Sequence, residues 1–229
     1  MYYPTDGSDV TFKAYYPYKG LGAYPTYPVN VSGQSDIAGL DLMTAVHKNA
    51  DESTANSKDK KEAHLVFYHR LAMAIVNVKT DTGSPIDLTG AKLAVKGLKT
   101  TGNYDLITDT WLNKENVQDI NIPLGANNTG RAILLPREAG EGVTFEVTTK
   151  NGGVYTAALD KDLELKSGSK YTFNLTLKTT PALITASIED WVGVPARGYD
   201  VIHVVTTQGV NEGFKQNDQL KLYIKDNGD

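Results

Sequence analysis

The sequence predicts an all-β protein built from β-sandwich domains, with one short helix near residues 36–47. Three observations support this fold class. Apolar and polar residues alternate over many short segments, as they do in half-buried strands. Tyrosine is plentiful, with 13 residues against 5 Phe and 2 Trp, and together with frequent Thr and Val this composition favours strands. Gly, Asn, Pro and Ser recur between the segments and supply the turns.

Size and charge narrow the class of protein. A chain of 229 residues is long enough for one large β domain or two smaller ones. The net charge is −4, and the strongest basic cluster, "SKDKKE" at residues 57–62, is interleaved with acids. Nucleic-acid binding is therefore not expected, because it needs concentrated Lys and Arg.

No apolar run approaches the roughly 18 residues of a transmembrane helix. The absence of Cys excludes disulfides and thiolate metal sites.

The first 62 residues contain one strand, one loop, one helix and one linker. Residues 9–16 alternate, with Val10, Phe12, Ala14 and Tyr16 on one face, and Pro17 ends this strand. Residues 20–33 are rich in Pro, Gly and Tyr and predict a loop. The last two segments are a short helix over residues 35–49, with Ile37, Leu40 and Met43 at helical spacing and Asp36 near its start, and a polar linker over residues 49–62.

From Glu62 onward nearly every segment predicts a strand. In residues 63–81, both faces become apolar after Leu71, as in a central strand that is covered twice. Asn151-Gly152 is a strong hairpin signal, because that turn requires positive φ. About seven strands at regular spacing indicate a β-sandwich. The expected core consists of Phe67, His69, Leu71, Tyr171, Phe173, Leu175, Ile188 and Trp191.

The titratable side chains predict no catalytic or metal site. His64 and His69 lie an odd number of residues apart in one predicted strand and therefore point to opposite faces. His69 is expected to be a core histidine with a satisfied ring nitrogen. The acids of "DKDLEL" at residues 160–165 lack the glycine of an EF-hand loop, since Leu165 stands there. No nucleophile has a plausible base, so we expect no catalytic residue, no metal, no cofactor and no enzymatic activity.

The early tyrosines allow two interpretations. Tyr15, Tyr18 and Tyr24, together with Tyr16 and Tyr27, could form an aromatic platform on which sugar rings stack. The favoured interpretation is a loop that packs its own aromatic rings over one end of a sandwich.

The C-terminal segment resembles the beginning of a domain. After the Gly/Pro linker that follows Trp191, residues 201–209 and 219–226 predict a further pair of strands. Leu220, Leu222 and Ile224 alternate with polar or aromatic residues, and a turn over residues 226–229 follows. A strand and a turn predict another strand, but none follows in this chain.

Five segments occur in one order, and they extend to about Gly193: "YYPTDGSDVTFKAYYPY", "GLDLMTA", "HLVFYHRLAMAIVNVKTD", "SGSKYTFNLTLK" and "SIEDW". Together, in this order, they resemble the fimbrillin family, the type V pilus subunits of bacteroidete bacteria. The resemblance implies transthyretin-like, Greek-key β-sandwich domains and export as an outer-membrane lipoprotein. It also implies assembly by donation of a strand into a neighbouring subunit, after proteolysis at an arginine.

The order of one motif departs from the family. The family's early "gD-x-(I/L)-x-(L/V)-(Y/F)" strand matches "NDQLKLYIKD" here, which comes after "EDW". Either the chain is a slice of a tandem protein, which we favour, or it is circularly permuted. The expected domains are the back part of an N-terminal domain at 1–61, a complete sandwich at 62–193, and a segment at 194–229. This last segment would begin a following unit or complete the 1–61 domain.

The expected function is that of a structural subunit of a surface fimbria or pilus, at the outer membrane, with its signal and lipid-bearing Cys upstream. Its partners would be other fimbrillin subunits, with host or bacterial surface glycans or proteins in addition. A surface adhesin module that binds carbohydrate is the alternative. The expected site residues are an edge strand at Val10, Phe12, Ala14 and Tyr16, a pairing strand at Leu220, Leu222 and Ile224, and a protease-accessible linker at Arg197. Only in the carbohydrate-binding alternative would Tyr15, Tyr18 and Tyr24 serve as glycan-stacking rings.

Overall fold

The computed structural model describes residues 9–21, 25–46, 53, 56–57, 65–178, 183–191, 194–195 and 203–206. They form two compact units. The first unit lies within residues 1–20, 43–68 and 193–229, and the second within residues 21–42 and 69–192. Both units are therefore assembled from segments far apart in the sequence, and residues 21–42 join the second unit although the sequence groups them with the first 61 residues.

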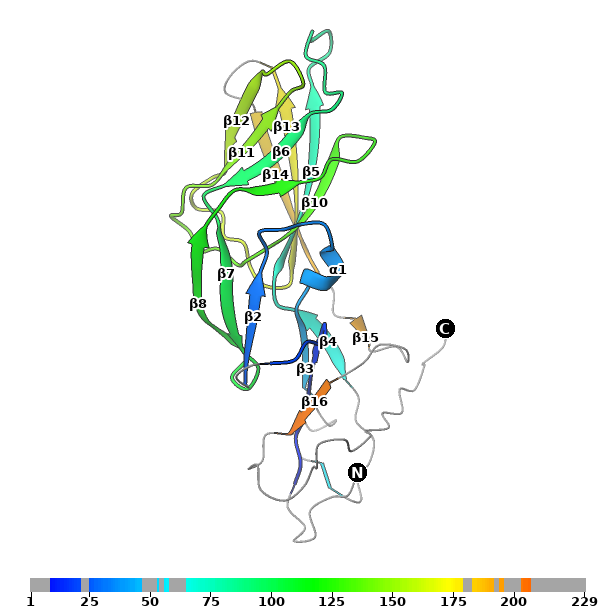
Figure 1. Cartoon of the computed structure of the whole chain (residues 1–229), viewed down its shortest axis with the longest axis vertical. Helices are drawn as coiled ribbons and strands as arrows, with labels where there is room; N and C mark the ends of the chain where they lie inside the picture. Colours follow the sequence, from blue (N-terminus) through cyan, green and yellow to red (C-terminus); the bar gives the residue numbers. More distant parts are fainter. Residues whose placement is uncertain are drawn as a thin grey trace. The chain divides into compact units, whose positions relative to one another are not determined.

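The second unit contains two four-stranded sheets (Figure 1). In the first of them, β5 and β13 pair in parallel, and the remaining neighbours are antiparallel. The rings of Phe145 and Phe173, one from each sheet, lie 4.9 Å apart between their centroids, so the two sheets share a core. The strand order in the first sheet is β10 (Thr129–Leu134), β5 (Ala72–Thr80), β13 (Ser169–Leu177) and β14 (Leu183–Asp190). The strand order in the second sheet is β12 (Val154–Ala158), β11 (Thr144–Thr148), β6 (Lys92–Lys96) and β9 (Ile120–Ile122).

A three-stranded sheet adds β2 (Thr26–Asn30), β7 (Lys99–Asp105) and β8 (Thr110–Val117) to the second unit. The expected loop at residues 20–33 is thus wrong in part, because β2 pairs with β7 over five residues. Pro28 is compatible with this strand because β2 lies at the edge of its sheet, where one side needs no ladder hydrogen bond.

The expected helix is confirmed but is shorter than the pattern indicates. Helix α1 covers Ile37–Leu40, and the side chain of Asp36 caps it by accepting a hydrogen bond of 3.0 Å from the backbone N–H of Gly39. Met43 does not continue the helix. It begins β3 (Met43–Val46), because the backbone at Asp41 has left the helical region with ψ of 87°.

The first unit is a five-stranded sheet with strands from both ends of the chain (Figure 1). Residues after Trp191 supply both of its edge strands. The order is β15 (Val194–Pro195), β4 (Val66–His69), β3, β1 (Phe12–Tyr16) and β16 (His203–Thr206).

The all-β sandwich prediction is confirmed, and so are six of the expected core residues: Phe67, His69, Leu71, Tyr171, Phe173 and Leu175 are all buried. Trp191 is only half-buried. The prediction that Ile188 is a core residue is wrong, because its side chain is large and hydrophobic but the residue is 55% exposed. It lies opposite the buried Tyr171 and so faces the core side of its sheet. However, β14 is the last described strand of that sheet, and the described residues leave this face open to solvent.

Candidate assembly surface

The candidate surface is the sheet of the first unit around β1. Strand β1 pairs on one side with β3, from Lys13 opposite Val46 to Tyr16 opposite Met43. On its other side it pairs with β16. The expectation that Val10, Phe12, Ala14 and Tyr16 form an edge is therefore wrong for the middle of this segment, where β16 pairs with residues 12–15.

The strand β16 was expected from its sequence, but its partner was not. Phe12 lies opposite Thr206, and Tyr15 lies opposite His203. Val10 is paired as well, because its backbone exchanges hydrogen bonds of 2.8 and 2.9 Å with Asn56. Both sides of the N-terminal segment are thus engaged within the same chain.

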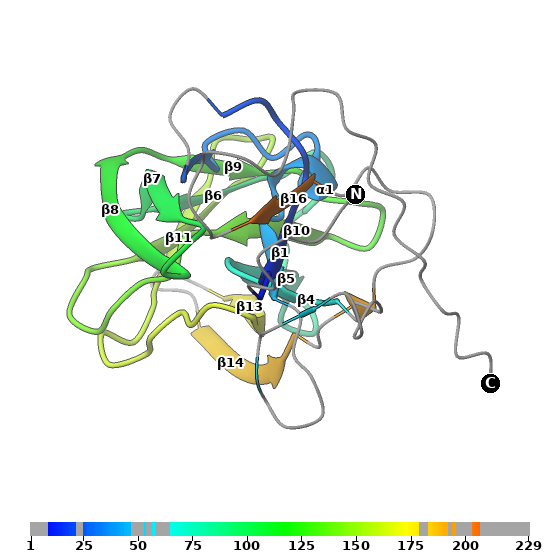
Figure 2. The same ribbon diagram turned by 90° about the horizontal axis from the view of Figure 1, so that it is seen from below.

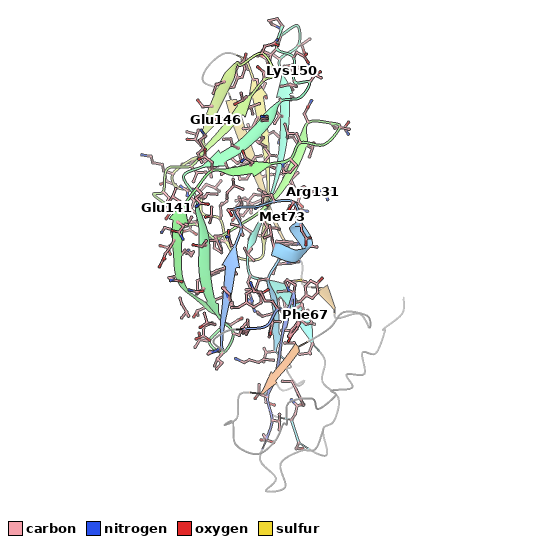
Figure 3. All side chains as sticks on the ribbon, in the orientation of Figure 1. Phe67, Met73, Arg131, Glu141, Glu146 and Lys150 are labelled. Carbon is pink, nitrogen blue, oxygen red and sulfur yellow. The ribbon has the colours of Figure 1, made fainter. Side chains whose placement is uncertain are left out.

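A small apolar cluster holds this sheet from one face. Ala14, Ala45, Leu65 and Phe67 are buried together, and Tyr16 and Met43 pack against them. Phe67, labelled in Figure 3, is the largest of the four buried side chains, and two of the others are alanines. Burial of apolar area stabilises this sheet, and Phe12 and Tyr15 of β1 are buried as well.

Tyr15 does not fit the alternative interpretation of a sugar platform. Tyr15 is only 2% exposed, so its faces are not available to a sugar ring. Its hydroxyl donates to the carbonyl oxygen of Lys19 at 3.4 Å, and its ring stacks on Tyr18 with centroids 6.4 Å apart. Burial lowers the pKa of the Lys19 ammonium in the same loop. Tyr18 is 50% exposed. The contact of Tyr15 with Tyr18 agrees with the favoured interpretation, in which the aromatic rings of this segment pack on each other.

The remaining predicted site residues are not described. Tyr24, Arg197, Leu220, Leu222 and Ile224 lie outside the described residues, so their roles stay predictions.

His69 has a partner that the sequence did not reveal. Its Nδ1 lies 2.8 and 3.0 Å from the two carboxylate oxygens of Asp41, and both residues are buried. The prediction of a core histidine with a satisfied ring nitrogen is confirmed. Asp41 directly follows the helix, and no local pattern indicates that an acid at this position lies beside a histidine 28 residues later. A histidine paired with a carboxylate can orient a proton, but the pair is packed into the core.

Within the described ranges, no three His, Asp or Glu side chains are placed to hold a metal ion. Among the same residues, no helix is both long and apolar enough to span a membrane.

Comparisons with known proteins identify the family. The family model described as Fimbrillin-like matches residues 1–191. A candidate fimbrium subunit of Bacteroides uniformis, Fim1C, is 28% identical over 200 residues, which cover 83% of this chain and 64% of that protein. The chain thus spans less than two thirds of the length of this relative.

Two crystal structures of candidate cell adhesion proteins share the fold. One, from Bacteroides uniformis, has a TM-score of 0.71 and 24% identity, and covers 84% of this chain and 77% of that chain. The other, from Bacteroides ovatus, has a TM-score of 0.64 and 24% identity, and covers 81% and 69%. At this level of identity the likeness establishes the fold, while the family model spans most of the chain. The protein therefore belongs to the Fimbrillin-like family.

Proposed function

We propose that this protein is a structural, non-catalytic subunit of a bacterial surface fimbria, exported to the outer-membrane surface. Copies of the protein would join when a β-strand of one copy adds to the sheet of the first unit in another copy. The family, and the fimbrium and cell adhesion names of its relatives, support the first part. The second part rests on one observation, the pairing of β16 with β1 inside one chain.

The pairing of β16 with β1 is suited to exchange between copies. If β16 leaves β1 and pairs with β1 of a neighbouring copy, the same backbone hydrogen bonds form again, so the exchange changes the enthalpy little. Strand β16 lies at the edge of its sheet and has only four residues, which favours local opening. The residues that follow β16 would extend the donated strand, with Leu220, Leu222 and Ile224 as the proposed pairing residues. These residues would complete the first unit in each copy.

Arg197 lies between the two edge strands, β15 and β16. Cleavage there would free β16 from the sandwich without breaking a strand of the second unit. An arginine-specific protease should cut the folded protein at Arg197 and spare Arg137, which is 3% exposed. Intact mass spectrometry measures this, and an unchanged mass would remove Arg197 from the proposal.

A disulfide lock tests strand exchange directly, because the native chain has no Cys. Lys13 and Val205 lie opposite each other in the pairing of β1 with β16, so Lys13→Cys with Val205→Cys should form a disulfide. The control is Thr148→Cys with Val154→Cys, which lie opposite each other in the hairpin of β11 and β12. Each protein is incubated at high concentration with and without reductant. Light scattering and electron microscopy then detect linear polymers.

The locked protein should form no linear polymers when oxidised and should form them after reduction, and the control should form them in both states. Polymers of the oxidised, locked protein would contradict exchange at β1. So would the absence of polymers from the control under both conditions.

A further inference from the structure

Strand β14 has an unusually exposed edge. All five residues from Thr185 to Glu189 are exposed, although side chains of a strand alternate between its faces. Both faces of β14 are therefore open. Its backbone pairs with β13 on one side, and no described strand pairs with the other side. Figure 2 shows β14 at the margin of its sheet.

The opposite edge of the same sheet is closed by a side chain. The amide of Gln34 pairs with the backbone of Ile133 on β10 in the way a neighbouring strand would. The Oε1 atom of Gln34 accepts a hydrogen bond of 2.9 Å from the N–H of Ile133, and its Nε2 donates 3.0 Å to the carbonyl oxygen of Ile133. A strand cannot be added there without displacing Gln34.

The other edges of the second unit are interrupted or short. Strand β8 contains a bulge opposite Asn103 and Tyr104, and Asn116 has a φ of 56°, which breaks regular pairing. Strand β2 contains Pro28. Strands β12 and β9 have only five and three residues. Such features are how natural sheets avoid edge-to-edge association. Strand β14 has eight residues without Pro, Gly or Lys.

We propose that the occupant of this edge is β14 of a second copy, paired antiparallel and centred on Ser187. In this register Ala186 of one copy lies opposite Ile188 of the other, and this occurs twice. Ile188 lies on the core face, opposite Tyr171, and is 55% exposed in the single chain. Self-pairing gives it an apolar neighbour and joins two four-stranded sheets into one continuous sheet.

The charges of β14 favour the antiparallel arrangement. The two acids, Glu189 and Asp190, both lie at its C-terminal end. Parallel pairing in register would place them beside their own copies, and like charges that lie directly opposite destabilise a sheet. In the antiparallel register Glu189 lies opposite Thr185 of the second copy. Within its own chain Glu189 already forms an ion pair with Lys170, with 2.5 Å between Oε2 and Nζ. The edge thus carries little uncompensated charge.

This contact is separate from the proposed exchange at β1. It uses the second unit, leaves β1 and β16 untouched, and would bring copies together side by side. A protein that fails to polymerise through β1 can still pair through β14, so the two proposals fail independently.

Cysteine cross-linking tests the register. Antiparallel partners that lie directly opposite have Cα atoms about 4.5–5.5 Å apart, within the range that a disulfide spans. Ser187→Cys would meet its own copy at the symmetry axis and should give a disulfide-linked dimer on mild oxidation. Thr185→Cys is the matched control. It is also exposed on the same strand but would lie about 14 Å along the strand from its copy, so it should form no disulfide-linked dimer.

A charge pair of variants tests the same register without cross-linking. Ser187→Lys places two ammonium groups opposite each other and should weaken dimerisation at least about fivefold in sedimentation equilibrium. Thr185→Lys adds the same charge opposite Glu189 and should preserve the dimer.

Two results would overturn the proposal. One is a Ser187→Cys protein that forms no disulfide-linked dimer under oxidation at high concentration. The proposal is overturned in the same way if this protein forms no such dimer but binds an added strand peptide of another protein. The other is cross-linking of Thr185→Cys as efficient as that of Ser187→Cys. Unchanged circular dichroism of the reduced variants shows that the fold is intact in each case.

Discussion

The imidazole of His69 lies flat on the indole of Trp191, with ring centroids 3.5 Å apart and ring planes 12° apart. The same imidazole is held at Nδ1 by Asp41. The three residues come from the end of helix α1, the end of β4 and the end of β14. All three residues belong to the second unit, and their contacts join segments that are distant in sequence.

Two substitutions of His69 separate its hydrogen bond from its stacking. His69→Phe keeps a ring on Trp191 but leaves the buried carboxylate of Asp41 without this partner, which should lower the free energy of unfolding by about 1–3 kcal/mol. His69→Ala should cost about 0.5–1.5 kcal/mol more, because the stacking is also lost. Denaturant unfolding followed by Trp fluorescence measures both, since Trp111 and Trp191 lie in the second unit. A His69→Phe protein as stable as the wild type would show that Asp41 does not need this bond.

Gln34 should contribute more to the free energy of unfolding than an exposed glutamine does. Gln34→Ala removes both hydrogen bonds to Ile133 and leaves buried backbone groups without partners, so the free energy of unfolding should fall by about 1–3 kcal/mol. Gln118→Ala, at an exposed position, is the control and should stay within about 0.5 kcal/mol of the wild type. Equal effects of the two substitutions in thermal or denaturant unfolding would contradict the capping role of Gln34.

Arg137 is buried, and its guanidinium is held by main-chain carbonyls. It donates to the carbonyl oxygens of Lys161, at 3.2 Å, and of Leu163 and Glu141. Arg137→Lys cannot reach these two loops at once, because an ammonium lacks the planar fork, so the free energy of unfolding should fall by about 2–3 kcal/mol.

The control for Arg137 is Arg131→Lys, on the exposed face of β10 and labelled in Figure 3. This substitution should change the free energy of unfolding by less than about 0.5 kcal/mol. A change in Arg137→Lys as small as that in the control would mean that one carbonyl contact suffices.

Stability should fall at alkaline pH partly because of Tyr104. Burial raises the pKa of its hydroxyl, the nearby charge of Arg70 opposes this, and the carboxylate of Asp109, which accepts a bond of 2.9 Å from that hydroxyl, adds to it. The unfolded chain ionises this tyrosine near pH 10, whereas the folded chain keeps it protonated. The resulting stabilisation is complete below about pH 10 and is lost as the pH rises toward the raised pKa.

Tyr104→Phe checks the alkaline prediction. The free energy of unfolding of the wild type should decline more steeply above about pH 10 than that of the variant, as measured by urea unfolding at a series of pH values. Parallel curves for the two proteins would assign the alkaline loss to other groups.

The sequence predicted local structure well where side chains alternate over a buried face. Phe173 and Leu175 alternate with polar residues on β13, and both are buried. Asp36 was recognised as a cap because its bond to Gly39 spans three residues. Strand β8 has no comparable signal, because nearly all its side chains are exposed and nothing forces apolar residues onto one face.

The sequence did not predict which strands pair, and the error in the assembly surface follows from this. The alternation in β1 predicts a strand and its buried face. It does not predict the partner strand, because the backbone groups that join Phe12 to Thr206 are the same in other residues. Ile188 illustrates the same limit. Its alternation correctly assigns it to the core face, but burial depends on whether another sheet extends over β14.

The sheet of the first unit also has a consequence for the order of events during synthesis and export. A chain that emerges N-terminus first presents β1, β3 and β4 before strands β5 to β14, and β15 and β16 only afterwards. Contacts between such distant segments form late in folding. For that interval, the side of β1 that β16 later takes has no partner from its own chain. In the proposed exchange at β1, β16 of an older copy would pair with β1 during this interval, before the chain's own β16 is present.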